Sequence, residues 1–292
     1  MKGLAEFVMR GRLQALLVTV AGAGSLMLCW ISAAVLALVT LRRGAGQGAW
    51  LLLWALLPAG TLMLVFGDSG PLALLVSTMA LALVLRATVS LPLAVLASVP
   101  LGALTGLGLL AFGQGMLDQM VGFFDEFITN LEQQLSSGEA GAVQLLRPTA
   151  VQVAGMMGAA NGLLSIACLL LARWWQAALY NPGGFAEEFR ALYLPPAVTL
   201  ALTLAAVALA SLGVEYRTWA VICLIPLNFA GLALVHARAA WRGRGGGWLT
   251  AFYLLWLFFD PVKLLVVGFA IADSWLRFRQ RWVRPGGDDS RQ

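Results

Sequence analysis

Long stretches of apolar residues alternate with short polar breaks along the chain. Within each stretch the apolar residues follow one another without the one-in-two alternation of a barrel strand, so the pattern predicts helices. Most stretches approach the roughly 20 residues that a helix needs to cross the hydrocarbon core of a bilayer. The apolar stretches cover residues 13–41, 47–66, 71–85, 89–113, 148–172, 196–213, 217–235 and 247–276.

Two stretches are too long for one upright span. Residues 13–41 would form a helix of roughly 43 Å and residues 247–276 one of roughly 45 Å, against a hydrocarbon core of roughly 30 Å. Each contains a helix-breaking sequence near its middle, AGAGS at 21–25 and DPVK at 260–263. Each stretch therefore forms either one tilted or kinked helix or a hairpin of two short helices.

The basic residues favour the hairpins. With two hairpins and a cytoplasmic N-terminus, 16 of the 19 lysines and arginines fall on the cytoplasmic side, as the positive-inside rule demands. We therefore predict about ten membrane segments, with eight or nine as the alternative, and both termini in the cytoplasm. The residues placed inside are Lys2, Arg10, Arg12, Arg42, Arg43, Arg86, Arg173, Arg190, Arg238, Arg242, Arg244, Arg277, Arg279, Arg281, Arg284 and Arg291; those outside are Arg147, Arg217 and Lys263.

The composition supports a membrane protein. The chain is 60% hydrophobic and 11% charged, with a mean hydropathy of +0.84. A soluble domain carries roughly 25% charged residues, so the expected fold class is an all-α, polytopic transmembrane helical bundle. The net charge of +5 is explained by the cytoplasmic loops, and we expect the lipid bilayer and no nucleic acid as a partner.

Two amphipathic segments are not expected to span. Within the acidic segment 114–147, apolar residues from Leu117 to Leu135 recur at three- and four-residue steps, which predicts a helix outside the membrane, either a plain surface helix or a lid. The segment 174–195 predicts a cytoplasmic elbow. We expect Trp174, Trp175 and Tyr180 to form an interfacial aromatic belt there, and Glu187 and Glu188 to be solvated. The chain is then one membrane domain, 1–292, with front helices 1–113 and back helices 148–292.

Polar residues inside the apolar stretches are the candidate ligand positions. In FFDPVK, Asp260 is predicted to cap a helix that Pro261 begins, after a helix that stops at Phe259. The alternative is that Asp260 and Lys263 are a buried acid and base that line a polar path. Asn161 and Asn228 also lie within predicted spans.

Enzyme motifs are missing from the sequence. The single histidine, His236, and the cysteines at 29, 168 and 223 are too scattered for a metal site, and the cysteines are expected to be free thiols. The stretch GRGGGW at 243–248 lacks the Lys-Ser/Thr of a phosphate loop, and the glycines at 105–115 fit helix packing better. We expect no catalytic residue, no cofactor and no metal.

Two segments resemble a known family. The tail VVGFAIADSWLRFRQR and the elbow NPGGFAEEFRALYLPP are similar to the YybS-like family of bacterial integral membrane proteins. The Gly…Asp…Phe-Arg pattern of its last helix falls here on Gly268, Asp273, Phe278 and Arg279, and its Pro-started helix on Pro195 and Pro196. The front part also resembles the substrate-binding subunits of energy-coupling-factor transporters, in hydropathy and loop rhythm. The resemblance to the YybS-like family implies a location in the bacterial cytoplasmic membrane. Its pattern makes Asp273 a further candidate ligand position.

Two functions remain open from the sequence. The first is a small-molecule-binding or transport subunit, energised by a separate ATPase module. The second is a non-transporting scaffold that docks other membrane proteins through the two amphipathic segments.

Overall fold

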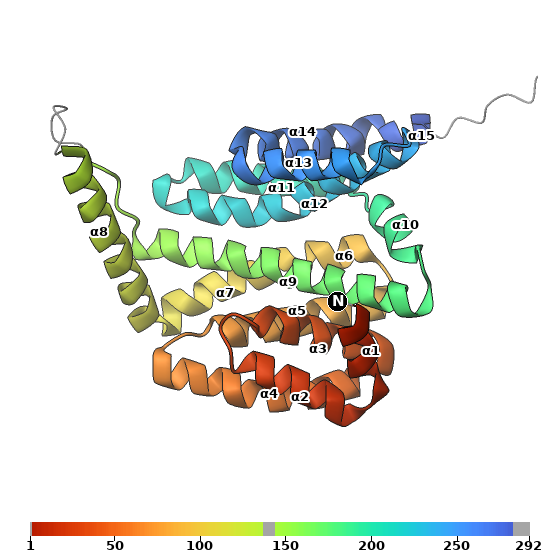
Figure 1. Cartoon of the computed structure of the whole chain (residues 1–292). Helices are drawn as coiled ribbons and strands as arrows, with labels where there is room; N and C mark the ends of the chain where they lie inside the picture. Colours follow the sequence, from red (N-terminus) through yellow and green to blue (C-terminus); the bar gives the residue numbers. More distant parts are fainter. Residues whose placement is uncertain (1, 137–143, 283–292) are drawn as a thin grey trace, which may run out of the picture.

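The computed structural model describes residues 2–136 and 144–282, and in these ranges it contains helices and no strand (Figure 1). This confirms the predicted all-α helical bundle. Arg284 and Arg291 lie outside the described residues. The helices are α1 (Lys2–Arg10), α2 (Arg12–Ala23), α3 (Cys29–Arg43), α4 (Ala45–Phe66), α5 (Gly70–Thr88), α6 (Leu91–Leu96), α7 (Ser98–Phe112), α8 (Gln114–Ser136), α9 (Ala150–Tyr180), α10 (Gly184–Arg190), α11 (Pro196–Ser211), the 3-10 helix η1 (Val214–Tyr216), α12 (Arg217–Trp241), α13 (Gly246–Phe258), α14 (Asp260–Leu276) and α15 (Phe278–Trp282).

Five helical segments of the described chain are long and apolar enough to cross a membrane, or six if α13 and α14 form one broken span. They are Ala45–Phe66, Gly70–Thr88, Leu91–Phe112, Ala150–Tyr180 and Val214–Trp241. The helices α2 and α11 are apolar but shorter. The chain is therefore a multi-pass helical membrane protein, and the ten predicted segments include helices too short to cross upright.

The first long stretch is broken, as predicted. The helices α2 and α3 pack side by side, and the hydroxyl of Ser32 on α3 donates to the carbonyl of Thr19 on α2 at 2.8 Å. At the far end of α3, Arg43 donates to the carbonyl of Met9 at 2.6 Å. These two contacts place α3 antiparallel to α2, so residues 13–41 form a hairpin.

The last long stretch is also broken, but one residue earlier than predicted. The helix α13 ends at Phe258, and the chain bends by 112° before α14 begins at Asp260. No residue of α13 is fully buried, and this apolar helix contacts the rest of the chain through partly buried residues such as Phe252 and Trp256.

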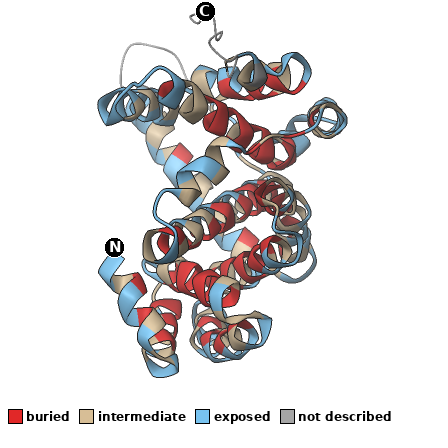
Figure 2. Cartoon of the chain, turned by 90° about the vertical axis from the view of Figure 1, so that its right-hand side faces the viewer, coloured by how far each residue is buried: buried red, intermediate tan, exposed pale blue. Residues whose placement is uncertain are grey.

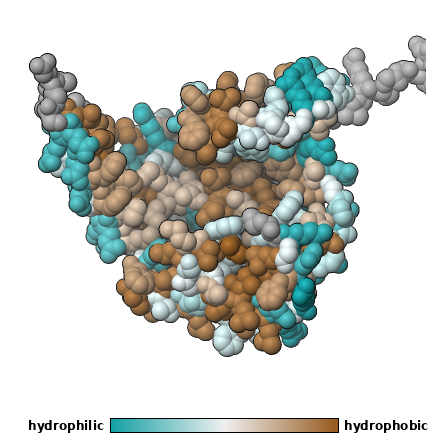
Figure 3. Space-filling view, viewed as in Figure 1, coloured by the Kyte–Doolittle hydropathy of each residue, from teal (hydrophilic) through white to brown (hydrophobic). Residues whose placement is uncertain are grey.

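The connections gather at two ends of the bundle (Figure 1). At one end, which we call the basic end, Arg42 stacks on Tyr180 at 3.8 Å, and Arg86 donates to the carbonyl of Leu41 at 2.8 Å. The other end, which we call the α8 end, carries the connections 24–28, 66–70 and 212–217. Figure 3 shows apolar surface between polar surface at α8 and near α10 and α15, as a membrane band requires.

Close packing of small residues holds α7 against α9. A Cβ on Gly102 would lie 2.8 Å from the carbonyl oxygen of Gly158, and one on Gly158 would lie 2.4 Å from that of Gly102. Glycines at these positions allow the two backbones to touch, which is a common way for helices to associate in lipid. Figure 2 shows the buried residues on the sides of the helices that face one another, and α3, α5, α9 and α12 hold most of them.

The elbow differs from its prediction. The helix α9 continues to Tyr180, so Trp174 and Trp175 lie on a long helix before the elbow, and Trp175 is fully buried at 0% exposure. Its predicted place in an aromatic belt was wrong, although Trp174 and Tyr180 are exposed. Glu188 is also half-buried, because its carboxylate pairs with Arg173 on α9 and is not simply solvated.

Candidate ligand pocket

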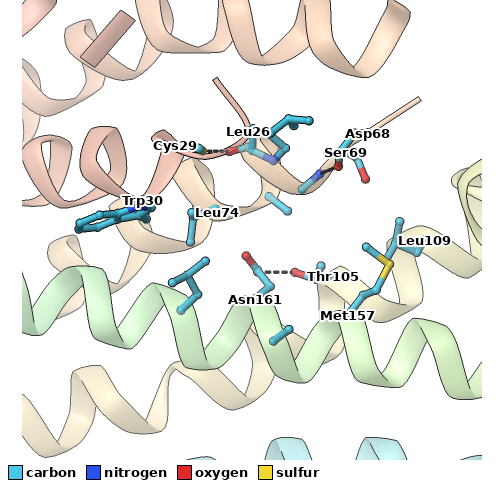
Figure 4. A pocket seen from close by; sticks show the side chains of 15 residues that line it. Leu26, Cys29, Trp30, Asp68, Ser69, Leu74, Thr105, Leu109, Met157 and Asn161 are labelled. Atoms are coloured by element: carbon cyan, nitrogen blue, oxygen red, sulfur yellow. Dashed lines mark hydrogen bonds between the residues drawn. The ribbon is translucent and has the colours of Figure 1, made fainter. Parts of the chain in front are cut away.

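A cavity of about 290 Å³ lies among α3, α5, α7 and α9, toward the α8 end of the bundle (Figure 4). Residues far apart in the sequence meet there because the α2–α3 turn and the α4–α5 turn approach the middle of α9. The lining residues are Leu26, Cys29, Trp30, Asp68, Ser69, Gly70, Pro71, Ala73, Leu74, Thr105, Leu109, Met157, Ala160, Asn161 and Leu164. The wall is mostly apolar with a few polar groups, as in most small-molecule sites.

The polar centre of the wall is Asn161 on α9. Its amide nitrogen donates to the hydroxyl of Ser77 at 2.9 Å and to that of Thr105 at 2.8 Å. The hydroxyl of Thr105 itself donates to the carbonyl of Leu101 at 2.8 Å, so its oxygen must accept from Asn161. This assigns the amide orientation and leaves the carbonyl oxygen of Asn161 without a donor among the described residues.

The α7–α9 packing sets this geometry. Gly102 lies one helical turn before Thr105 on α7, and Gly158 lies one turn before Asn161 on α9. Because both glycines lack a side chain, Thr105 reaches Asn161 directly. The polar centre is therefore held by two rigid helices and not by a loop.

One charged residue lines the cavity. Asp68 lies in the α4–α5 turn, where one carboxylate oxygen accepts from the backbone N–H of Gly70 at 2.8 Å. Its other oxygen has no donor within residues 2–136 and 144–282, and no lysine or arginine from these ranges lines the cavity. The wall thus carries one uncompensated negative charge.

The helix α8 begins beside the mouth of the pocket. The hydroxyl of Ser69 points at the sulfur of Met116 at 3.6 Å, and a Cβ on Gly67 would lie 4.0 Å from the side-chain oxygen of Gln119. Leu117 and Ile128 are buried, whereas Phe127 is 57% exposed. The helix was predicted with Phe127 on its apolar face, but the bundle covers that face only partly.

The structure does not bring the five predicted candidates together. Asn161 alone lines the pocket. The side chain of Asn228 on α12 accepts from the indole N–H of Trp256 at 3.0 Å, and this bond ties the otherwise exposed α13 to the bundle. Its role is therefore explained by packing.

Asp260 and Lys263 form an exposed pair. Asp260 is the first residue of α14 and makes no capping hydrogen bond, so the predicted N-cap was wrong: Phe259 occupies that position. The side chain of Asp260 is instead 87% exposed and accepts from Lys263 at 2.8 Å. The bend of 112° turns this end of α14 outward.

Asp273 is buried at the basic end, where one carboxylate oxygen lies 3.1 Å from Nε of Arg279. Arg279 also donates to the carbonyls of Arg190 at 2.7 Å and Ala230 at 3.2 Å. Burial lowers the pKa of Arg279, and the carboxylate of Asp273 opposes this effect. The pair joins α14 and α15 to the elbow and α12.

No metal site is found in the described chain. In residues 2–136 and 144–282 no group of three or more histidine, cysteine or acidic side chains is placed to hold a metal ion. The cysteines at 29, 168 and 223 are free and buried, as predicted.

No family model, curated protein or solved structure matches the chain. The resemblance to the YybS-like family and to the substrate-binding subunits of energy-coupling-factor transporters therefore stays a prediction.

Sequence reasoning missed Asp68. A signal was present, because Asp68 is the one acidic residue between Glu6 and Asp118. Asp68 lies between two predicted spans, where an acidic residue is common, so the sequence alone does not single it out. Its place in the pocket depends on the side chains around it.

Proposed function

We propose that this protein is a membrane subunit that binds a small molecule in the pocket around Asn161. The observation that carries the proposal is the fixed amide of Asn161, whose carbonyl oxygen has no protein donor in the described chain and lies in a mostly apolar wall. Because this acceptor is held in place and has no protein donor, a ligand that donates to it gains both affinity and orientation.

The proposal includes no catalysis. Transport driven by ATP would need an ATPase module on another protein, because the sequence contains no phosphate-binding loop. The protein would then act as the binding component of a larger membrane assembly.

The test is ligand retention by the purified full-length protein. We expect small molecules extracted from the wild type to include a compound that Asn161→Leu loses and that Asn228→Leu keeps. Asn228 is the matched control because it also makes a hydrogen bond between helices, but outside the pocket. If the wild type retains no compound, and no compound in a metabolite collection raises its melting temperature, the proposal is wrong.

We further infer that the basic end faces the cytoplasm of a bacterial cell and that the α8 end faces outward, so the pocket mouth lies on the outer side. The support is the gathering of basic residues at the end that carries both described termini. In a background without native cysteines, a membrane-impermeant thiol reagent added to whole cells should label Glu215→Cys and not Arg242→Cys. The reverse pattern contradicts the orientation.

A scaffold is the second candidate function. Phe123 and Phe127 on α8 are 62% and 57% exposed, and such aromatic surface suits a protein partner. Cross-linking in membranes distinguishes the candidates: a scaffold keeps a stoichiometric partner that depends on Phe123 and Phe127 and is indifferent to Asn161→Leu.

A further inference from the structure

We propose that the pocket around Asn161 selects a compact organic cation, an ammonium group joined to a small apolar body. This inference rests on the proposed function and gives the class of its ligand. It follows from three properties of the wall: its charge, the hydrogen-bonding groups that it leaves free, and its shape.

The charge of the wall excludes anionic ligands. Asp68 is the one ionisable acid among the lining residues, and within the described chain no arginine or lysine lines the cavity to balance it. A carboxylate or phosphate ligand would add a second negative charge in an apolar surrounding, where repulsion is weakly screened. A single positive charge on the ligand would neutralise Asp68.

The free hydrogen-bonding groups of the wall favour a ligand that donates hydrogen bonds. Apart from the indole N–H of Trp30, the side-chain donors of the wall are already directed elsewhere: the hydroxyl of Thr105 to Leu101, and the thiol of Cys29 to the carbonyl of Pro71 at 3.7 Å. The hydroxyl of Ser69 points at the sulfur of Met116. Away from Trp30, the groups left open are acceptors, one carboxylate oxygen of Asp68 and the carbonyl oxygen of Asn161. An ammonium group supplies only donors and therefore matches this wall.

The shape of the wall places the apolar body. In Figure 4, Asp68 and Trp30 lie toward opposite sides of the pocket, with Asn161 between them. An ammonium near Asp68 would leave the rest of the ligand along Leu74 toward the indole of Trp30. A bare divalent metal ion does not suit this wall, since calcium takes roughly six to eight oxygen ligands. The volume of about 290 Å³ restricts the body to a small one.

The experiment measures binding to the full-length protein in lipid nanodiscs by calorimetry, with empty nanodiscs subtracted. The probes are methylamine, butylamine and 2-phenylethylamine, each compared with the alcohol and the carboxylate of the same carbon skeleton. We expect at least one amine to bind, with the matching alcohol roughly tenfold to a hundredfold weaker and the carboxylate not detected.

The deciding variant is Asp68→Asn. Asparagine keeps the acceptor for the N–H of Gly70 and removes only the charge, so the turn before α5 should persist. We expect this variant to bind amine and alcohol equally, while Asp260→Asn, an exposed acid outside the pocket, keeps the preference for the amine. A preference that survives in Asp68→Asn overturns the inference.

Two further outcomes separate this inference from the proposed function. If alcohols or carboxylates bind and no amine does, or if the compound that Asn161→Leu loses is neutral or anionic, the ligand class is wrong and the proposed function stands. If no probe binds and the wild type retains no compound, both are wrong.

Discussion

Asp68 at the α8 end and Asp273 at the basic end are both acids beside apolar helices, but the partners of their carboxylates differ. Asp273 is 2% exposed, and its charge is met by Arg279, which is held in turn by two backbone carbonyls. Asp68 has a backbone N–H on one oxygen and no basic partner in the described chain. The first acid has a counter-charge built into the fold, whereas the second has none in the described chain.

The comparison teaches how to distinguish a structural acid from a binding acid in one membrane protein. Burial alone would select Asp273, because a buried ionisable group near a membrane is often functional. The ion pairs point the other way, since the counter-charge of Asp273 is internal, although its Oδ1 is buried without a hydrogen-bond partner. The acid without a counter-charge in the described chain is the better candidate.

The largest expected effect is at the basic end. Arg279→Met leaves the carboxylate of Asp273 buried without its counter-charge, which costs about 3–5 kcal/mol. We expect little folded protein from Arg279→Met, measured as monodisperse yield and melting temperature in detergent.

The double variant Asp273→Leu with Arg279→Met removes both charges and should recover much of the yield. Arg281→Met, on the exposed side of the same short helix, is the control and should behave as the wild type. Normal stability of Arg279→Met alone would mean that Asp273 does not need its partner, and the contrast with Asp68 would disappear.

The second effect concerns the packing that builds the pocket. In Gly102→Ala the new methyl group would lie 2.8 Å from the carbonyl oxygen of Gly158, so α7 must move away from α9. Overpacking of this kind costs about 1–3 kcal/mol. Gly108→Ala is the matched control on the same helix, because its methyl group would meet nothing within 4 Å. Equal melting temperatures for the two variants would contradict the close approach of the helices.

The sequence could predict the helical class and the broken first stretch, because these follow from local patterns. Apolar runs and helix breakers act on neighbouring residues, and the hairpin of α2 and α3 confirms the predicted break. The pocket was beyond this reasoning. Residues 29, 68, 105 and 161 meet through packing between helices, which a hydropathy pattern does not encode.

The errors have a common physical origin. Trp175 was assigned to the interface because tryptophan is common there, but the length of α9 carries it into the core. Glu188 was expected to be solvated because it lies on a polar elbow, but the elbow folds back onto Arg173. Asp260 was expected to be the N-cap of α14, but Phe259 occupies the N-cap position. In each case the extent or position of a neighbouring helix overrode the local preference of the residue type.

A smaller effect tests the polar centre of the pocket. Thr105→Val keeps the shape of the side chain but removes the oxygen that accepts from Asn161. Losing this bond should cost about 0.5–1.5 kcal/mol of stability, and the freed amide should weaken ligand binding. Thr203→Val is the control, since Thr203 bonds only within its own helix, to Thr199. If both variants bind the ligand as the wild type does, the orientation of Asn161 is not set by Thr105.

The smallest effect is expected at a third acid, Asp260, which sharpens the comparison because its partner is also internal but lies in the open. An exposed pair between a lysine and an acid contributes less than about 1 kcal/mol, since solvent already screens both charges. Asp260 makes no capping bond, so Asp260→Ala should be tolerated as well as Asp260→Asn, whereas a capping aspartate would make alanine the worse of the two by about 0.5–2 kcal/mol. The measurement is the melting temperature of the two variants beside Lys263→Gln. A clear loss in Asp260→Ala alone would show that its side-chain oxygen supports the start of α14. Three near-silent variants would place Asp260 among the solvated charges and leave Asp68 as the acid whose partner comes from outside the chain.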